Sequence, residues 1–220
     1  MVLEHYGIPT APFACIPPRN LWPKDFDPLS VIQNSVHREA LNVFPLFLKP
    51  AAEGTGMGIS QANKVSNRKQ LLEVLDDISQ RYPTQTILIE RFLAGREFTV
   101  GIIGTGADAS VIGVRELVFL KDNPEFPVDP TTIYISQDPT LFEIEVYGYD
   151  LKHAGSPNPQ YVDMDLSSDP VAQGAASVAL KAWSLLGCRD GGRIDLRHDN
   201  NNVPNFIEVG PPNQFICAPS

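Results

Sequence analysis

The chain has few cysteines and no long apolar run. Its three cysteines, Cys15, Cys188 and Cys217, are widely spaced and form no C-x-x-C pair, which favours neither a disulfide framework nor a structural zinc site. No segment offers about 18 uninterrupted apolar residues, the length that a membrane span needs. The N-terminal sequence MVLEHYGIPTAPFACIPP has no basic region and is interrupted by prolines, unlike a signal peptide. We therefore expect a cytoplasmic protein with no membrane span.

Positive charge is also scarce. Lys and Arg number 17 against 26 Asp and Glu, so the formal net charge is −9. A nucleic-acid backbone or an anionic membrane surface is therefore a poor match for this protein, and any anion that it binds needs a local site. We expect neither nucleic acid nor membrane as a partner.

Proline is the residue in excess, with 20 in 220 residues. Many prolines lie within residues 7–30 and 121–168, so both segments are expected to be mostly irregular, with short strands near residues 13–16 and 143–146. The hydrophobic share of 43% is ordinary for a globular protein. The length suits one large domain or two small lobes that share a cleft.

Hydrophobic periodicity predicts two helices. The first covers residues 68–81, with Asn67 and Gln70 resembling a capping box and Pro83 after its end. The second covers residues 170–186, with Asp169 as its N-cap. The expected apolar stripe of the second helix consists of Val171, Ala175, Val178, Ala182 and Leu185.

Strand composition appears in residues 44–49, 86–91, 97–103 and 110–120. The bend between the second and the third of these segments is so short that we expect the two strands to pair in antiparallel fashion. The chain closes with GGRIDLRH, the turn DNNN and VPNFIEV, which predict a β-hairpin.

The terminal hairpin brings two carboxylates together. A period of two residues places Arg193, Asp195 and Arg197 on one face, and a hairpin centred on the Asn run puts Asp195 nearly opposite Glu208. Two like charges at a cross-strand position are destabilising unless a cation lies between them. Either both carboxylates form ordinary ion pairs with Arg193 and Arg197 in solvent, or they hold a divalent ion, most naturally Mg²⁺.

A glycine-rich loop follows the strand at 44–49. The loop Glu53-Gly54-Thr55-Gly56-Met57-Gly58 has glycine at every second position, so its N–H groups could converge on a phosphate beside the ammonium of Lys49. It matches neither of the two common glycine-rich phosphate motifs, so a hairpin turn beside a surface lysine is the other interpretation.

Three further charged residues have two interpretations each. Glu90 and Glu97 flank a bend and could accept hydrogen bonds from amino and ribose hydroxyl groups, or could be solvated strand ends. Lys152 either brings a charge over a cleft or solvates a loop.

Taken in order, these segments resemble the ATP-grasp superfamily and, within it, the D-alanine–D-alanine ligase family. The resemblance is carried by HYGIPTAPF, FLKPAAEGTGMGIS, ILIERFLAGREFTVGII, VYGYDLKH, ALKAWSLLGCRDGGRIDL and NFIEV. It implies an α+β fold in which two lobes with largely antiparallel sheets clamp ATP. Residues 1–95 would form the small lobe with the glycine-rich flap, and residues 96–220 the large lobe with the metal site, while the family's N-terminal domain is absent.

The resemblance also implies a role for each candidate residue. Lys49 would contact the α- and β-phosphates and Lys152 the γ-phosphate, under a flap made of Glu53, Gly54, Thr55, Gly56 and Gly58. Glu90 and the backbones of Phe92 and Leu93 would hold adenine, and Glu97 the ribose. The metal ligands would be Asp195, Glu208 and Asn213. Arg193, Lys152 and Thr55 would be the catalytic residues.

The implied reaction joins two amino acids at the expense of ATP, with Mg²⁺ or in its place Mn²⁺. One carboxylate attacks the γ-phosphorus to give an acyl phosphate, and the amine of the second amino acid then displaces phosphate. Negative charge builds on phosphoryl oxygens and then on an oxyanion, so lysines, a divalent cation and an arginine are useful catalysts. The partners would be small amino acids, and a homodimer is left open.

Several positions depart from the family. Gly210 stands where the family has a metal-ligand Asn, His153 where a Tyr couples to the flap, and Thr55-Gly56 where two serines are usual. Three hypotheses are therefore kept: a ligase of the D-alanine–D-alanine type, a non-catalytic nucleotide-binding module, and a fragment of a longer ligase. The sequence identifies no particular amino-acid substrate.

Overall fold

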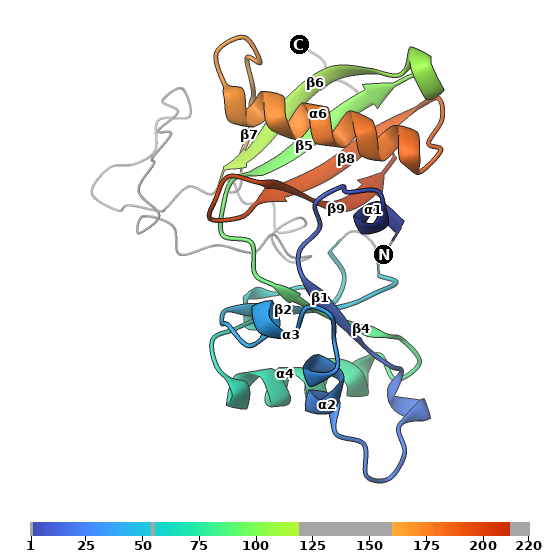
Figure 1. The fold of residues 1–220 in the computed structure, drawn as a ribbon, viewed down its shortest axis with the longest axis vertical. Coiled ribbons are helices and arrows are strands. Elements are labelled where there is room, and N and C mark those ends of the chain that lie inside the picture. Colours follow the sequence, from blue (N-terminus) through green and yellow to red (C-terminus); the bar gives the residue numbers. More distant parts are fainter. Residues whose placement is uncertain (1, 54–55, 119–159, 212–220) are drawn as a thin grey trace, which may run out of the picture.

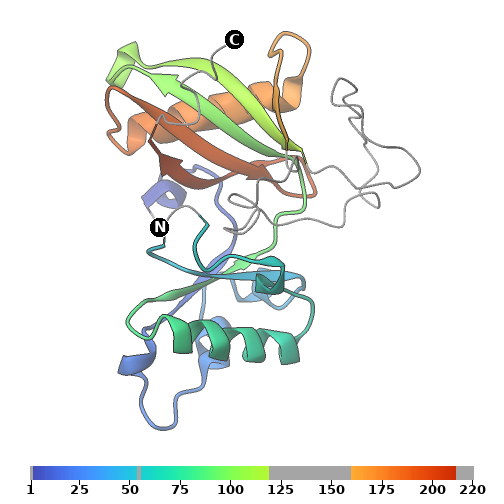
Figure 2. The ribbon, with the colours of Figure 1, turned by 180° about the vertical axis from the view of Figure 1, so that it is seen from behind.

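The computed structural model describes residues 2–53, 56–118 and 160–211 of the chain. These residues form two antiparallel sheets, each with helices packed on it, as Figures 1 and 2 show from opposite sides. The predicted α+β class with largely antiparallel sheets is thereby confirmed. The strand expected near residues 143–146 lies outside the described residues.

The small lobe is the sheet of β1 to β4 with the helices packed on it. Its strands run in the order β1-β4-β2-β3. They are β1 (Phe13–Ile16), β2 (Leu46–Pro50), β3 (Lys64–Val65) and β4 (Ile87–Arg91). Its helices are α2 (Pro28–Gln33), α3 (Arg38–Leu41) and α4 (Arg68–Arg81), of which α2 and α3 lie in segments where no helix was predicted. Leu48, Ile89 and Ile78 are completely buried where the sheet meets α4.

Helix α4 has the predicted bounds and cap. The side chain of Asn67 accepts a hydrogen bond from the backbone N–H of Gln70 at 3.0 Å, which satisfies a donor in the first turn. The side chain of Gln70 accepts from the backbone N–H of Ser66 at 2.8 Å rather than from Asn67, so the reciprocal bond is displaced by one residue. Leu71, Leu75 and Ile78 face the core, as the periodicity predicts.

The large lobe is the sheet of β5 to β9 with α6 on one face. Its strands run in the order β7-β6-β5-β8-β9. They are β5 (Glu97–Ile103), β6 (Ser110–Val118), β7 (Gln160–Asp163), β8 (Gly191–His198) and β9 (Pro204–Gly210), and the helix is α6 (Pro170–Leu185). Figure 1 shows α6 lying across the sheet, where Phe98, Val100 and Ile194 form the core.

Helix α6 confirms its predicted start but not its full apolar stripe. The Asp169 carboxylate accepts from the backbone N–H groups of Val171 at 2.9 Å and Ala172 at 3.1 Å. Leu185 is 40% exposed. The buried face consists of Ala172, Ala175, Ala176, Ala179, Ala182 and Trp183. Its alanines are small and let the helix approach the sheet closely. Among the described helices, none combines the length and apolar character that crossing a bilayer requires.

The predicted pairing between residues 86–91 and 97–103 is wrong. β4 pairs with β1 and β2 in the small lobe, whereas β5 pairs with β6 and β8 in the large lobe. Each strand buries its apolar residues in a different core, so the short bend at residues 92–96 joins the lobes and is not a hairpin turn. The Gly95 N–H donates to the His198 carbonyl, and the His198 N–H donates to the Arg96 carbonyl, both at 2.8 Å. These two bonds tie the bend to the end of β8.

The first residues of the chain lie against the large lobe. Helix α1 (Val2–His5) and Ile8 pack through Leu3 onto Ala182 of α6, and Thr10 forms an isolated parallel bridge with Phe206 of β9. The division of the chain near residue 95 stays a prediction.

The burial of α4 predicts a sharp contrast between two leucines on the same helix. Leu75 is 2% exposed and Leu72 is 39% exposed. We expect Leu75→Ala to lower the free energy of unfolding by about 2–5 kcal/mol, because it removes buried methyl groups and leaves a cavity. Leu72→Ala should cost less than about 1 kcal/mol. Urea denaturation measures both, and equal losses would contradict the packing described.

Candidate functional site

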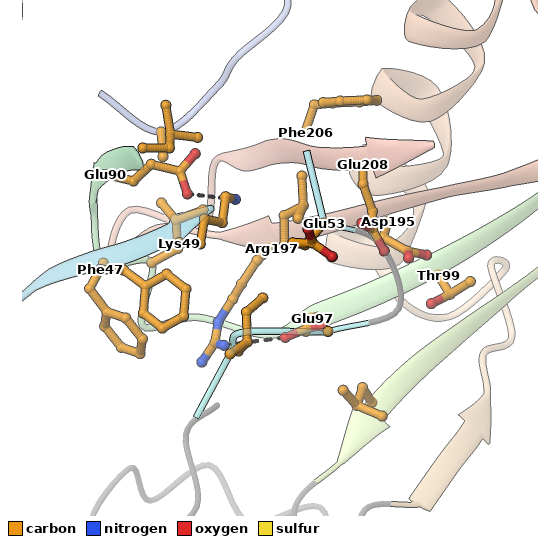
Figure 3. Close-up of a pocket in the computed structure, with 18 of the residues that line it drawn as sticks. Phe47, Lys49, Glu53, Glu90, Glu97, Thr99, Asp195, Arg197, Phe206 and Glu208 are labelled. Carbon is orange, nitrogen blue, oxygen red and sulfur yellow. Dashed lines mark hydrogen bonds and ion pairs between the residues drawn. The ribbon is translucent and has the colours of Figure 1, made fainter. Parts of the chain in front are cut away.

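A cleft of about 310 Å³ lies between the two lobes. Strands β2 and β4 supply its small-lobe wall, and β5, β8 and β9 supply its large-lobe wall, as Figure 3 shows. The bend that joins the lobes closes one side through Phe92 and Leu93. A ligand in this cleft would therefore contact both lobes at once.

Almost all described candidate residues meet in this cleft. They are Lys49, Glu53, Gly56, Glu90, Phe92, Leu93, Glu97, Arg193, Asp195 and Glu208. Gly54, Thr55, Lys152 and Asn213 lie outside the described residues, so their roles stay predictions.

Gly58 does not line the cleft. Its φ is +74°, and a Cβ built there would lie 2.9 Å from the Pro50 side chain and 3.0 Å from the Tyr82 hydroxyl. Its carbonyl accepts from the Asn63 side-chain amide at 2.8 Å, and the same amide donates to the Leu48 carbonyl at 2.7 Å. Gly58 therefore anchors the C-terminal end of the loop against the small lobe.

Lys49 and Glu90 form an ion pair on the small-lobe wall. Lys49 Nζ lies 2.6 Å from Glu90 Oε2, and each side chain is about one-fifth exposed. The two residues lie on neighbouring antiparallel strands, where Phe47 is directly opposite Glu90 and Lys49 is two positions along. A phosphate that approached Lys49 would compete with Glu90 for the ammonium, and the freed carboxylate could then accept hydrogen bonds from a base.

Glu97 and Arg197 form a second pair on the large-lobe wall. Arg197 Nη1 lies 3.2 Å from Glu97 Oε2, and the guanidinium carbon lies 5.0 Å from the centre of the Phe92 ring. The Phe92 N–H already donates to the Pro45 carbonyl at 3.2 Å. Sequence reasoning treated Arg197 only as an ion-pair partner, although its position two residues after Asp195 places it on the cleft face.

The predicted register of the terminal hairpin is confirmed. Asp195 lies directly opposite Glu208, and the register shifts between Asp195 and Leu196, so that Phe206 lies opposite Leu196. This bulge places Phe206 beside Leu196, where it packs against the core of the large lobe. Figure 3 shows Asp195 and Glu208 close together at the cleft, with Thr99 beside them.

Arg193 partly compensates the charge of this carboxylate pair. Its Nε donates to both oxygens of Asp195, at 3.2 and 3.1 Å, and its Nη2 lies 3.8 Å from Glu208 Oε1. Thr99 lies directly opposite Asp195 on β5 and lines the same cleft. Sequence reasoning missed Thr99, because only the pairing of β5 with β8 brings it there.

Burial raises the pKa of Asp195 to about 6. The positive charge of Arg193 acts in the opposite direction, the charge of Glu208 raises the pKa further, and the hydrogen bonds from Arg193 and Thr99 lower it. The side chain is only 15% exposed, so its negative charge depends on the cations around it.

The donor chemistry of this pair fits a hard divalent cation. Two carboxylates from adjacent strands converge on one side of the cleft, and oxygen ligands are what Mg²⁺ prefers. Within residues 2–53, 56–118 and 160–211, no group of three or more His, Cys, Asp and Glu side chains could hold a metal ion. A further protein ligand would have to be of another type or lie elsewhere in the chain.

Behind the bend lies a completely buried histidine, His198. Its Nδ1 lies 3.2 Å from the Arg96 carbonyl, and its Nε2 has no hydrogen-bond partner among the described residues. Burial lowers the pKa of His198, and the positive charge of Arg96 lowers it further, while its hydrogen bond to the Arg96 carbonyl and the charges of Asp199 and Glu116 act in the opposite direction. His198 therefore favours the neutral form in the folded protein.

Comparison with solved structures identifies the fold as that of ATP-grasp ligases. The D-alanine–D-alanine ligase from Bacillus anthracis superposes with a TM-score of 0.60 at 16% identity, over 95% of this chain and 53% of that one. A structure of the Bacillus anthracis ligase complexed with ATP gives 0.57 at 15% identity, over 95% and 51%. VanG D-Ala:D-Ser ligase from Enterococcus faecalis gives 0.59 at 17% identity, over 95% and 49%.

The chain belongs to the family described as D-ala D-ala ligase C-terminus, whose profile matches residues 2–213. It is 31% identical over 165 residues to the D-alanine–D-alanine ligase of Bordetella petrii and 30% identical over 165 residues to that of Actinobacillus pleuropneumoniae. Each alignment covers 75% of this chain, but only 42% and 43% of those proteins. The resemblance read from the sequence is confirmed, and the chain spans less than half the length of these relatives.

The buried histidine predicts a specific pH dependence. The unfolded chain takes up a proton on this residue near pH 6.5, whereas the folded protein resists protonation until a lower pH. The free energy of unfolding should therefore fall as the pH drops below about 6.5, and His198→Phe should reduce this fall. Urea titrations between about pH 7.5 and 5.5 measure the slope of the free energy of unfolding against pH. An identical slope in both proteins would contradict the assignment.

Proposed function

We propose that the chain provides the ATP-binding lobes of an ATP-dependent carboxylate–amine ligase of the D-alanine–D-alanine type. The observation that carries the proposal is the single cleft in which Lys49, Glu90, Glu97, Arg193 and Asp195 meet, although they come from two lobes. Membership of the family supports the reaction class.

The nucleotide would lie along the bend. Lys49 would exchange its partner Glu90 for the α- and β-phosphates, and Glu90 would turn to the adenine amino group. The carbonyl of Phe92 and the backbone of Leu93 complete the base site, and Glu97 accepts from the ribose hydroxyls. Lys152 would reach the γ-phosphate under a flap of residues 53–58 that includes Thr55, and the closed flap would keep water from the acyl phosphate.

Asp195 and Glu208, with Asn213 as a third candidate, would hold Mg²⁺ or Mn²⁺. Such an ion supplies positive charge to the phosphoryl oxygens when it is bound. Arg193, on the same wall, would donate to the carbonyl oxygen of the acyl phosphate and to the oxyanion formed when the amine attacks. Thr99, directly opposite Asp195 on the neighbouring strand, would help to position this carboxylate.

The substrate class that we propose is a pair of amino acids. Proteins of similar fold include a D-alanine–D-alanine ligase, a D-Ala:D-Ser ligase and an L-amino acid ligase, so the fold accepts more than one amino acid. The homodimer stays a prediction.

One observation favours an alternative, a nucleotide-binding module with impaired catalysis. Gly210 offers no side chain where the family has a metal-ligand Asn, and the space beside it is filled by the guanidinium of Arg193. A fragment of a longer ligase is the other alternative, because the relatives are more than twice as long as the aligned region. The genomic sequence on both sides of the reading frame distinguishes that case.

Phosphate release tests the ligase proposal directly. With ATP and Mg²⁺, we expect release that depends on an added amino acid, measured across a panel of D- and L-amino acids. If no amino acid elicits release but ATP raises the melting temperature, the protein is a binding module. If ATP neither raises the melting temperature nor is turned over, the assignment of the cleft is wrong.

Asp195→Asn tests the metal site. Because the variant loses a charged oxygen ligand, we expect the contribution of Mg²⁺ to ATP affinity to fall by about tenfold or more. Isothermal titration calorimetry with and without Mg²⁺ measures this contribution. Asp163→Asn is the matched control, since Asp163 lies on β7 of the same sheet and is 80% exposed. An unchanged Mg²⁺ dependence in Asp195→Asn would rule out this site.

A further inference from the structure

Gly210 and Arg193 lie directly opposite each other in the β8–β9 ladder. A Cβ built on Gly210 would lie 2.8 Å from the guanidinium carbon of Arg193 and 3.0 Å from each of its terminal nitrogens. The 2.8 Å distance is shorter than real Cβ contacts and the 3.0 Å distances are tight, so a side chain at position 210 would displace the flexible end of Arg193. The conformation of Arg193 therefore requires glycine at this position.

We propose that Gly210 is a positioning residue that lets Arg193 act as the resident counter-cation of Asp195 and Glu208, so that the guanidinium and a divalent cation compete for the same carboxylates. The proposal rests on the proposed metal site. It concerns how that site is regulated before the nucleotide arrives.

The contacts of Arg193 hold it in this place. Its Nε bonds both Asp195 oxygens, its Nη1 donates to the Pro211 carbonyl at 3.2 Å, and its Nη2 lies 3.8 Å from Glu208. The Arg193 side chain is only 10% exposed. Its charge is thus desolvated and compensated almost entirely by the two carboxylates that a metal ion would need.

In the described part of the chain, the other cations of the cleft do not compensate the Asp195 and Glu208 carboxylates. Lys49 is paired with Glu90, Arg197 is paired with Glu97, and Arg91 donates to the carbonyls of Val43 and Pro45. Arg193 carries one positive charge against the two negative charges of Asp195 and Glu208. A divalent cation added beside the guanidinium would raise the positive charge of the cluster to three, at separations where repulsion is strong.

The competition couples the cation to the anionic ligand. A phosphate or an acyl oxyanion offers Arg193 another partner and thereby frees the carboxylates for the divalent cation. By linkage, the cation must then strengthen binding of the anion by the same factor. The protein should therefore bind a divalent cation weakly when no anionic ligand is present.

Binding of Mn²⁺ alone, followed by electron paramagnetic resonance of the free ion, tests the proposal without any turnover. We expect Arg193→Met to bind Mn²⁺ at least about tenfold more tightly than the unchanged protein, because the competing cation is gone. Gly210→Ala should strengthen binding by about threefold or more, because its Cβ displaces the flexible end of Arg193.

Two matched controls separate this effect from general perturbation. Gly191→Ala adds a methyl group at the start of the same β8 strand, where its Cβ would meet only the Ile102 carbonyl at an ordinary 3.6 Å. Arg115→Met removes an arginine from β6, where Arg115 pairs with Asp163 at 2.7 Å. Both should bind Mn²⁺ as the unchanged protein does.

Equal or weaker Mn²⁺ binding by Arg193→Met would overturn the proposal. So would tight binding by Arg193→Met without any gain in Gly210→Ala, because Gly210 would then have no positioning role. If Arg193→Met fails to fold, the Mn²⁺ affinity of Gly210→Ala alone tests the proposal, and no gain in that affinity overturns it. Failure of ATP to bind would refute the proposed function but would leave the Mn²⁺ affinities, and hence the competition, open to the same measurement.

Discussion

A buried carboxylate that needs a positive charge beside it organises this cleft. Asp195 is largely removed from water and faces a second carboxylate, Glu208, across the hairpin. Without compensation this pair would be strongly destabilising. Arg193 supplies the charge from two residues away on the same strand, and Gly210 supplies the room for it. The carboxylate pair, the bulge after Asp195 and the close contact at Gly210 therefore belong to one local arrangement.

Charges are also compensated by neighbouring side chains in the rest of the cleft. Lys49 pairs with Glu90 on one wall and Arg197 with Glu97 on the other, so these charged residues of the cleft already have partners in the protein. Ligands would bind by exchange of partners and not by filling a site of excess charge. This arrangement would let a strongly acidic chain accept the polyanion that we propose as its ligand.

A third group of charges fixes the bend that joins the lobes. Arg96 bonds both oxygens of Glu116, at 2.7 and 2.6 Å, and reaches Asp169 at 2.7 Å. These bonds raise the pKa of Arg96 and lower the pKa of Asp169. Asp169 also caps α6, so the bend, β6 and the helix are held at one point. Glu97, which follows Arg96, is thereby positioned with the large lobe, whereas Glu90 belongs to the small lobe.

The features that could be predicted from the sequence are those whose partners are set by local spacing along the chain. The cap at Asn67 and the pairing of Asp195 with Glu208 follow from local spacing, and the structure confirms both. The separation of β4 from β5 depends on which core each strand enters, and a short bend gives no signal of that choice. Thr99 joins the site only through sheet pairing. Gly210 leaves room for the guanidinium of Arg193. In the sequence this glycine indicates only that a metal-ligand side chain is missing, whereas in the fold it allows Arg193 to lie beside the two carboxylates.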